Sequence, residues 1–510
     1  MFSAVSTRIH KFLVRRPDVV IWLILGYFVL CVLLRVIRSE SLQNDEAEQA
    51  FQAQMLLLGY GRQPPVYNWL QYGMVHLFGL SVATISLLKN GLLFFCCLFY
   101  LAAARMVVRD RRLPFVAMLG VLAVPSVTIL AQRDLTHAIA TLCLVSLFLC
   151  TLLNLLKRPT LVAYLAVGLT VGLGIITKYN FVILPAAAIL AMLPDADFRR
   201  RLLDWRVIPA VLVAFAIVTP HLVWVLYHLD LATTDTVKAM HEGASGDAVK
   251  DTARGLISIL ESTLEGSAPV LLVFGLVFFR DLGTAFRAES RWTRLVGGMI
   301  IASLIIVALI GIGFGASSIR QKWLSPFLLL LPLYLVLKLD AIEGDMRQSV
   351  ARMAPPLLGI VTGFSFYLAV GNLIGPLIGD YGKEHIPYRP FLEQVMTERG
   401  ERPAYVITSD LMMAGNLRLQ LPTVPVILPD QPLPVSLEAA AQQGAGLIAW
   451  PAKAGEPLPE SAAALVQAHG LVLDESAGAR PMAVPYLYSR GRADFTFGYA
   501  WVKQAPSPAR

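Results

Sequence analysis

Long apolar segments alternate with short polar loops along most of this chain. The first apolar run spans Val19 to Leu34, and further runs recur up to Pro355–Val370. Each approaches the roughly 20 residues that a helix needs to cross the hydrocarbon of a bilayer. The pattern therefore predicts a polytopic α-helical membrane protein with about eleven transmembrane helices.

The pattern changes after residue 371, where proline and glycine become frequent and the apolar runs become short. Brief runs of β-branched and aromatic residues in this region predict strands, and a helical pattern between the first two predicts a strand–helix–strand unit. The expected strands are Tyr405–Thr408, Val424–Leu428, Gly446–Trp450 and Phe495–Val502, and the expected helix is Leu411–Leu419. We therefore expect a transmembrane domain over residues 1–371 and a small α/β domain over residues 372–510, with its last few residues disordered.

Basic residues indicate how the spans are oriented. They precede the first span and then recur in every second loop. The main clusters are Arg8, Lys11, Arg15 and Arg16, then Arg105, Arg109, Arg111 and Arg112, and then Arg199, Arg200, Arg201 and Arg206. Cytoplasmic loops are enriched in lysine and arginine. We therefore place the N-terminus in the cytoplasm, and the loop 39–76 and the C-terminal domain in the periplasm. No small-residue cleavage site follows the first cluster, so we expect a retained anchor.

The composition supports a membrane protein and argues against a soluble domain or a nucleic-acid-binding protein. Hydrophobic residues make up 56% of the chain and charged residues 15%, against about 25% charged residues in an ordinary soluble domain. The net charge of +8 is concentrated in short loops, so it reports topology rather than a nucleic-acid-binding face. All five cysteines lie inside apolar runs, which favours small buried side chains over a disulfide framework or a thiolate metal site.

The first outer loop, residues 39–76, carries the most unusual chemistry. Asp45 and Glu46 follow a span directly, where carboxylates are costly and are usually functional. An apolar–polar pattern from Ala50 to Leu58 predicts a helix that lies along the membrane interface. We interpret the loop as the catalytic loop of a membrane transferase, with Asp45 and Glu46 as its catalytic acids. Gln63, before a pair of prolines, and Tyr67 are the expected substrate-loop residues.

Further outer residues extend this site. Asp134 opens the second outer loop, and with Asp45 it fits catalytic acid–base work or metal binding beside a reacting sugar. His137 follows one helical turn later and is a third expected substrate-loop residue. The competing interpretation is that Asp134 caps the helix that starts at Leu135, and the sequence does not decide between them. Lys178, Arg320 and Lys322 are cations at the outer ends of spans. We expect them to bind a phosphate, because headgroup contacts by snorkelling basic residues are favoured on the other side of the membrane.

Three other features have less support as parts of a catalytic site. His221, at the top of the seventh span, could be a metal ligand, although a lone histidine near a helix end is more often structural. Asp195-Ala196-Asp197 matches the Asp-x-Asp motif of soluble nucleotide-sugar transferases, but it lies in an arginine-rich inner loop. We therefore do not assign it that role. Gly168 and Gly172 have the spacing for close packing of helices and need no catalytic role.

Taken in order, several segments resemble the GT-C glycosyltransferases of the protein-mannosyltransferase and lipid A aminoarabinose-transferase type. The likeness is greatest to the rhizobial lipopolysaccharide galacturonosyltransferases and covers about three quarters of the chain. It rests on Asp45-Glu46-Ala47, Gln63-Pro64-Pro65, Thr177-Lys178-Tyr179-Asn180 and the segment from Arg320 to Pro326.

The resemblance implies a GT-C-like fold and an inverting transfer of a sugar from a polyprenyl-phosphate donor at the periplasmic face. It implies that Asp45 lies at the reaction centre, with Asp134 matching the acid of the second outer loop. It also implies that Lys178, Arg320 and Lys322 hold the donor phosphate. The enzyme is then expected in the bacterial inner membrane, with lipopolysaccharide, lipid A or another glycoconjugate of the envelope as its acceptor. The choice among these acceptors does not follow from the resemblance, because the C-terminal region departs from the better-known members.

Other functions stay open on the sequence alone. A transporter or flippase could bind the same lipid-linked sugar without reacting it, and a protein O-glycosyltransferase or an outward scaffold would have a similar pattern. Acids at the outer boundary rather than at the bilayer midplane favour the transferase. No nucleotide is required, the sequence leaves open whether a divalent metal ion takes part, and membrane lipids are expected partners. The sugar and the acceptor are not specified.

Overall fold

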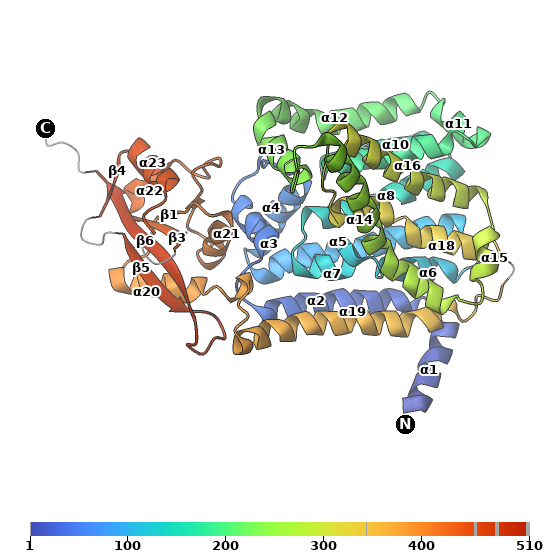
Figure 1. Cartoon of the computed structure of the whole chain (residues 1–510), viewed down its shortest axis with the longest axis horizontal. Helices are drawn as coiled ribbons and strands as arrows, with labels where there is room; N and C mark the ends of the chain where they lie inside the picture. The colour runs from blue at the N-terminus through green and yellow to red at the C-terminus, as the bar shows by residue number, and fades with distance from the viewer. Residues whose placement is uncertain (1, 343, 453–455, 475–478, 506–510) are drawn as a thin grey trace. The chain divides into compact units, whose positions relative to one another are not determined.

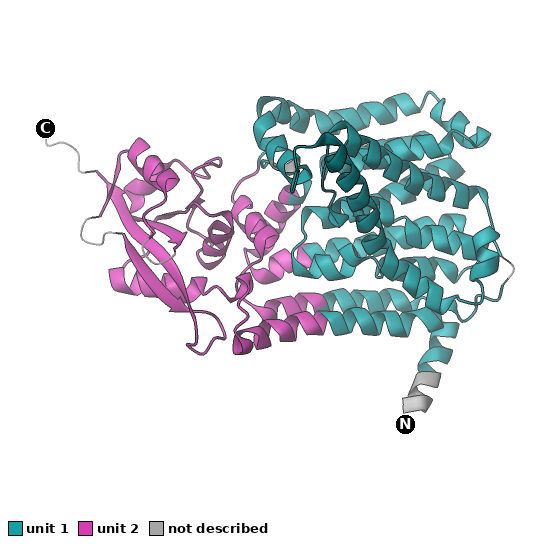
Figure 2. Cartoon of the chain, viewed as in Figure 1, with its two compact units in different colours: residues 1–30, 57–67, 89–364 teal, residues 31–56, 68–88, 365–510 magenta. Residues whose placement is uncertain are grey.

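The computed structural model describes residues 2–342, 344–452, 456–474 and 479–505. By its internal contacts the chain divides into two compact units (Figure 2). Unit 1 comprises residues 1–30, 57–67 and 89–364, and unit 2 comprises residues 31–56, 68–88 and 365–510. The first polar loop therefore belongs largely to the same unit as the C-terminal region. The boundary between residues 371 and 372 stays a prediction.

The part of the chain up to residue 374 is helical (Figure 1). Its helices are α1 (Phe2–Arg15), α2 (Val19–Arg38), α3 (Asn44–Gln52), α4 (Val66–Phe78), α5 (Val82–Val107), α6 (Leu113–Val121), α7 (Pro125–Arg133), α8 (His137–Lys157), α9 (Leu161–Ile175), α10 (Ile183–Met192), α11 (Ala196–Leu202), α12 (Val207–Tyr227), α13 (Leu229–Met240), α14 (Ala248–Val277), α15 (Leu282–Arg287), α16 (Arg291–Gly313), α17 (Gln321–Leu328), α18 (Leu331–Asp340) and α19 (Ser349–Ile374).

Among the described residues, nine helical segments are long and apolar enough to span a bilayer. Two of them, 113–133 and 321–340, each combine two consecutive α-helices, and Ser349–Ile378 combines α19 with a 3-10 helix, Gly375–Ile378. The shorter apolar segments Leu161–Ile175 and Tyr179–Met192 bring the total to eleven. The prediction of a polytopic helical membrane protein with about eleven spans is confirmed.

Close helix packing in unit 1 follows from small residues. A Cβ atom on Gly168 of α9 would lie 2.2 Å from the carbonyl oxygen of Ala210 in α12, and one on Gly172 would lie 3.0 Å from that of Ala214. Only glycine lets two helix backbones approach this closely. The packing role expected for this glycine pair is confirmed.

The C-terminal part of unit 2 is an α/β domain built on a six-stranded sheet (Figure 1). Its elements are α20 (Tyr388–Arg399), β1 (Tyr405–Ile407), α21 (Leu411–Gln420), β2 (Val426–Ile427), α22 (Leu437–Gln443), β3 (Gly446–Pro451), α23 (Glu460–Ala468), β4 (Leu471–Leu473), β5 (Arg480–Pro485) and β6 (Asp494–Gln504). The main strand order is β2-β1-β3-β6-β4, and β5 also pairs with β6. Strands β2, β1 and β3 are parallel, and β6 runs antiparallel to β3, β4 and β5.

The strand–helix–strand prediction is confirmed by β1, α21 and β2. All four expected strands are present, with β2 shorter than expected. Buried side chains of β1, β3 and the covering helices, including Tyr405, Ile448 and Leu437, form one hydrophobic core. The residues for which we expected disorder lie partly outside the described chain, which ends at residue 505.

One element of the first loop differs from the prediction. The helix expected over Ala50–Leu58 is wrong, because helix α3 begins at Asn44 and ends at Gln52. At its start, the Glu46 carboxylate accepts a hydrogen bond from the backbone nitrogen of Gln43 (3.4 Å), a capping contact that starts a helix. Most of α3 is buried. It is therefore a packed helix of unit 2, and most of its polar side chains are buried in the protein interior.

Candidate active site

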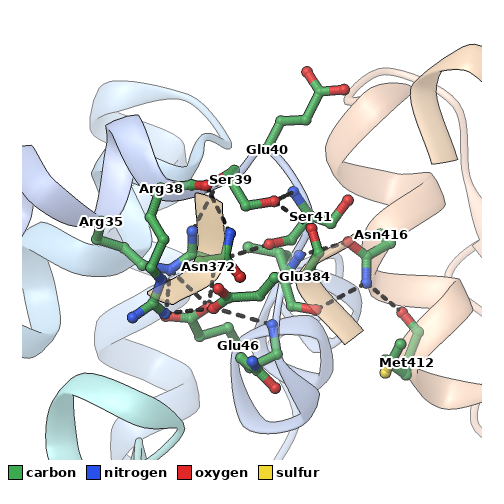
Figure 3. Close-up of polar contacts among 12 residues, drawn as sticks. Arg35, Arg38, Ser39, Glu40, Ser41, Glu46, Asn372, Glu384, Met412 and Asn416 are labelled. Carbon is green, nitrogen blue, oxygen red and sulfur yellow. Dashed lines mark hydrogen bonds and ion pairs between the residues drawn. The ribbon is translucent and has the colours of Figure 1, made fainter. Parts of the chain in front are cut away.

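Helix α3 presents the two predicted acids differently. Asp45 lies in its first turn and is partly exposed, whereas Glu46 is 1% exposed. The Glu46 carboxylate forms a buried ion pair with Arg35 of α2, at 2.6 Å from Nη2 to Oε2 (Figure 3). The Nε atom of Arg35 also donates to both carboxylate oxygens, at 3.2 and 3.1 Å. Glu46 is thus held in place, while Asp45 has access to solvent.

The same arginine fixes the turn between α2 and α3. Arg35 donates to the carbonyl oxygens of Ser39 (2.9 Å) and Ser41 (3.0 Å) as well as to Glu46. A guanidinium group has five donors in a rigid fork, and a buried one is stable only when they are paired. Arg35 therefore connects the end of one helix, the turn and the start of the next.

A second buried ion pair links this turn to the segment that follows α19. Arg38 pairs with Glu384, and the Ser39 hydroxyl donates to the carbonyl oxygen of Glu384 at 2.6 Å. The Ser41 hydroxyl donates to the carbonyl oxygen of Ile386 at 2.8 Å. Figure 3 shows these contacts converging on residues 35–46. All of them lie within unit 2.

Helix α21 of the α/β domain packs directly on α3. The Asn416 side chain accepts a hydrogen bond from the backbone nitrogen of Leu42 (2.7 Å) and donates to its carbonyl oxygen (3.3 Å). A Cβ on Gly415 would lie 1.9 Å from the carbonyl oxygen of Ala47. The Gln54 amide exchanges two hydrogen bonds with the backbone of Val426 in β2. The C-terminal domain therefore holds both ends of α3.

Buried amides connect α3 to α4. Asn68 donates to the side-chain oxygens of Gln49 (3.2 Å) and Gln52 (2.5 Å). Asp45, Gln49 and Gln52 are spaced i, i+4 and i+7, which places them on one face of the helix. Gln71, one turn after Asn68, is fully buried, and neither atom of its amide has a hydrogen-bond partner among the described residues. The α3 face that carries Asp45 is therefore lined with amides.

Unit 1 contains a cavity of about 320 Å³ with a polar side and apolar walls. The polar side includes Arg62, Gln63 and Lys178. The apolar walls come from α10, α16 and α17, and include Ile183, Val307, Ile310, Trp323, Leu324 and Phe327. Asn180 donates to the carbonyl oxygen of Trp323 at 2.8 Å and so joins two of the walls. Cations above a hydrocarbon cavity fit a lipid that ends in a phosphate.

The predicted phosphate-binding cations separate into two groups. Lys178 lines the cavity, together with Arg62, which the sequence analysis did not identify. Arg320 is exposed and pairs with Glu242 at 2.5 Å, and neither it nor Lys322 is among the residues that line the cavity. Arg62 could have been found from its position directly before Gln63.

Asp134 and His137 lie at the junction between helices α7 and α8. Asp134 follows the last residue of α7, and α8 begins at His137 after Thr136. Asp134 therefore lies two residues before Thr136, the N-cap residue of α8, and both interpretations of Asp134 stay predictions. The rings of His137 and Tyr67 are 5.5 Å apart, so two of the predicted substrate-loop residues are neighbours in unit 1.

His221 belongs to a stack of rings. Its Nε2 is 3.1 Å from the Tyr179 hydroxyl and its Nδ1 is 2.7 Å from the carbonyl oxygen of Leu58. Its ring is stacked between those of Tyr179 and Trp224. The described residues include no cluster of three or more His, Cys, Asp or Glu side chains that could hold a metal ion. Metal ligation by His221 stays a prediction, and its hydrogen bond to Leu58 holds the backbone at that residue.

Sequence reasoning missed the buried charges of the spans. Arg35 and Arg38 lie within the last turns of an apolar helix, and Lys89 of α5 is fully buried. Ionisable residues inside membrane helices usually mark functional or structural sites. That signal was present in the sequence, but their partners were not visible there.

Comparison with solved structures defines the class. The crystal structure of ArnT from Cupriavidus metallidurans bound to undecaprenyl phosphate superposes with a TM-score of 0.61 at 15% identity, covering 95% of this chain and 98% of ArnT. The apo form of ArnT gives a TM-score of 0.56. The fold is thus that of a polytopic GT-C membrane protein with a C-terminal α/β domain, as predicted.

The sequence comparisons define the family. Residues 62–224 match the family model described as dolichyl-phosphate-mannose-protein mannosyltransferase. The chain is 40% identical over 486 residues to the lipopolysaccharide core galacturonosyltransferase RgtA of Rhizobium johnstonii, covering 94% of this chain and 96% of RgtA. It is 39% identical over 487 residues to RgtB of the same organism, covering 94% and 97%. The chain therefore belongs to the family of membrane glycosyltransferases that includes RgtA and RgtB. The predicted enzyme class, a glycosyltransferase, is confirmed.

Proposed function

We propose that the protein transfers galacturonic acid, with inversion, from a polyprenyl-phosphate donor to the core of lipopolysaccharide. Two relatives that match along nearly their whole length are named lipopolysaccharide core galacturonosyltransferases. A structure of the same fold is bound to undecaprenyl phosphate. By the distribution of basic loops, the reaction takes place at the periplasmic face of the bacterial inner membrane.

The observation that carries the proposal is the cavity in unit 1. Arg62 and Lys178 line it together with apolar side chains of α10, α16 and α17. A polyprenyl phosphate combines the same two features, an anionic head and a hydrocarbon chain. The isoprenoid chain would follow the apolar walls, and the phosphate would lie by the two cations.

The same cations have a role in the reaction. When the bond between the anomeric carbon and the phosphate oxygen breaks, negative charge grows on the departing polyprenyl phosphate. Positioned cations stabilise this charge more in the transition state than in the ground state. Arg320 and Lys322 then act at the outer rim, where they meet the donor before it is bound.

Asp45 is the candidate general base. In the proposed step, the acceptor hydroxyl oxygen attacks the anomeric carbon, and the hydroxyl proton passes to the Asp45 carboxylate. Asp134 acts as the second carboxylate and orients the acceptor. Glu46 has a positioning role, because both of its oxygens face Arg35. The amides of Gln49 and Gln52 share the α3 face of Asp45 and support its orientation.

Mass spectrometry of the envelope glycolipids tests the proposal. A strain that lacks the gene is compared with strains complemented with the wild type or with Asp45→Asn. We expect the loss of one hexuronate mass from lipopolysaccharide, restored by the wild type alone. An unchanged glycolipid profile with normal levels of lipid-linked sugar would contradict the proposal and favour transport. Accumulation of unused lipid-linked sugar in the strain that lacks the gene supports the transferase.

A further inference from the structure

The Asp195-Ala196-Asp197 motif, which the proposed reaction does not use, lines a second cavity in unit 1. This cavity has a volume of about 590 Å³ and is formed by α10, the start of α11 and α16. Its charged lining residues are Asp195, Asp197, Arg291 and Arg294. Its other walls are largely apolar and include Leu190, Ile301 and Ile305. The cavity therefore combines a charged mouth with an apolar interior.

The mouth carries two positive and two negative side chains in a defined arrangement. The Nη2 atom of Arg291 lies 3.3 Å from Asp195 and 3.4 Å from Asp197, and its guanidinium group covers the ring of Phe198 at 4.3 Å. Its Nε atom is buried and has no hydrogen-bond partner among the described residues. Arg291 thus bridges two carboxylates from the centre of the cluster.

The charged groups of Asp197 and Arg294 are available to a ligand. The Asp197 carboxylate is 66% exposed, and its contact with Arg291 is long. Arg294 is also 66% exposed, and its contact with Glu289 measures 3.9 Å. Such surface pairs contribute little free energy, so a ligand can replace them at low cost. One anionic and one cationic group are therefore free to meet opposite charges on the same ligand.

The charged mouth of the second cavity lies at the end of α16 remote from the first cavity, and its apolar interior extends along α16 to Ile305, two residues before Val307. Val307 and Ile310 of α16 line the first cavity, whereas Arg291 and Arg294 line the second. The nineteen steps from Arg291 to Ile310 correspond to about 29 Å of helix, close to the roughly 30 Å thickness of the hydrocarbon. The second cavity therefore opens at the arginine-rich face, away from the cavity that contains Lys178.

We propose that the second cavity binds a glycerophospholipid with a zwitterionic headgroup, of the phosphatidylethanolamine type. Its phosphate contacts Arg294, its ammonium group contacts Asp197, and one acyl chain follows Leu190, Ile301 and Ile305 into the apolar interior. The net charge of the four lining side chains is zero, which matches the zero net charge of such a headgroup. This lipid connects α10 to α16, the two helices that also form walls of the first cavity.

Charge complementarity distinguishes this lipid from other membrane components. An anionic phospholipid would offer phosphate to Arg294 but would leave the Asp197 carboxylate facing a negative headgroup. The hydrocarbon end of a polyprenyl chain that entered from the opposite face would offer nothing to either charge. The zwitterionic headgroup offers a phosphate to Arg294 and an ammonium group to Asp197.

Native mass spectrometry of the purified full-length protein tests the proposal. Phosphatidylethanolamine, phosphatidylglycerol or polyprenyl phosphate is added singly and then in competition. We expect preferential retention of phosphatidylethanolamine by the wild type. Arg294→Gln should lower this retention about fivefold, the factor that corresponds to the loss of one surface charge contact. Asp197→Asn should shift the preference towards phosphatidylglycerol, because the mouth then carries a net positive charge.

Two further variants complete the test. Ala302→Phe fills the apolar interior and should reduce retention of both phospholipids, whereas Arg287→Gln removes an exposed arginine that does not line the cavity and should change nothing. Equal retention by the Arg294→Gln and Arg287→Gln variants would overturn the proposal. So would the absence of a headgroup preference in the wild type, or displacement of phosphatidylethanolamine by equimolar polyprenyl phosphate.

Discussion

Gly415 of α21 lies so close to Ala47 of α3 that a Cβ atom on the glycine would be 1.9 Å from the Ala47 carbonyl oxygen. This contact brings a helix of the C-terminal domain against the helix that carries Asp45. Reciprocal hydrogen bonds between Asn416 and Leu42 lie beside it. The α/β domain is therefore part of the support of the first loop.

Gly415→Ala should separate α3 from α21 and displace Asp45. We expect a drop of the transfer rate of at least tenfold together with a lower melting temperature, because a methyl group cannot fit against backbone at this distance. Transfer to purified lipopolysaccharide and thermal unfolding in detergent measure the two effects. The control is Gly371→Ala in α19, where a Cβ atom would meet nothing within 4 Å. If Gly415→Ala behaves like that control, the contact does not position the loop.

Substitutions in the Arg35–Glu46 pair test whether Glu46 positions helix α3 or takes part in catalysis. Arg35→Met or Glu46→Leu alone should destabilise unit 2 by about 3–5 kcal/mol, because each leaves a buried charge unpaired. The double variant should recover much of this loss, since apolar residues can replace a buried ion pair. Thermal unfolding of the four proteins gives the coupling free energy.

Activity of the same double variant decides the role of Glu46. If Glu46 only positions α3, the stable double variant should retain measurable transfer activity, whereas Asp45→Asn should retain none. A double variant that is stable but fully inactive would make Glu46 a catalytic residue.

Arg62 and Lys178 should determine donor binding. Replacing both with glutamine should raise the KM for the polyprenyl-phosphate sugar at least tenfold, because two charge-assisted contacts to the phosphate are lost. The matched pair Arg320→Gln with Lys322→Gln removes the same charge outside the cavity lining and should raise the donor KM less. Steady-state kinetics with varied donor give both values. A larger effect of the second pair would place the phosphate at Arg320 and Lys322 instead.

Lys89 is fully buried in α5, and a lysine in such a position is expected to have a functional role. We predict that Lys89→Gln lowers transfer by at least an order of magnitude, whereas Lys89→Arg, which keeps the charge, retains more activity. Transfer assays and size-exclusion profiles of both variants are the measurement. Equal activity of the Lys89→Gln variant and the wild type would show that the charge is dispensable.

The orientation can be measured independently of activity. A reporter fused after Arg510 should be active outside the cytoplasm, because the basic loops place the N-terminus inside and an odd number of spans separates the two ends. A second reporter, in the loop at Arg109, should report the cytoplasm. A cytoplasmic signal from the fusion at Arg510 would remove the basis for placing Asp45 at the periplasmic face.

The main elements were predictable because their signals are local. The apolar runs gave the spans, and the strand–helix–strand pattern around Leu411–Leu419 gave β1, α21 and β2. The helix expected over Ala50–Leu58 was wrong, because burial against α21 and α4, rather than the membrane interface, determines the structure of that segment. The amphipathic pattern shows that a face is to be buried but not what covers it.

The sequence by itself determined the membrane class, the number of spans and the segments that carry acids and cations, since length, hydropathy and charge are properties of single segments. The tertiary structure alone decided which of these residues act together. It paired Glu46 with Arg35, left Arg320 outside the lining of the cavity that contains Lys178, brought Arg62 into that lining and packed Gly415 on Ala47. These relationships join residues up to several hundred positions apart, and they depend on packing geometry and on the pairing of buried charges, which no local pattern contains.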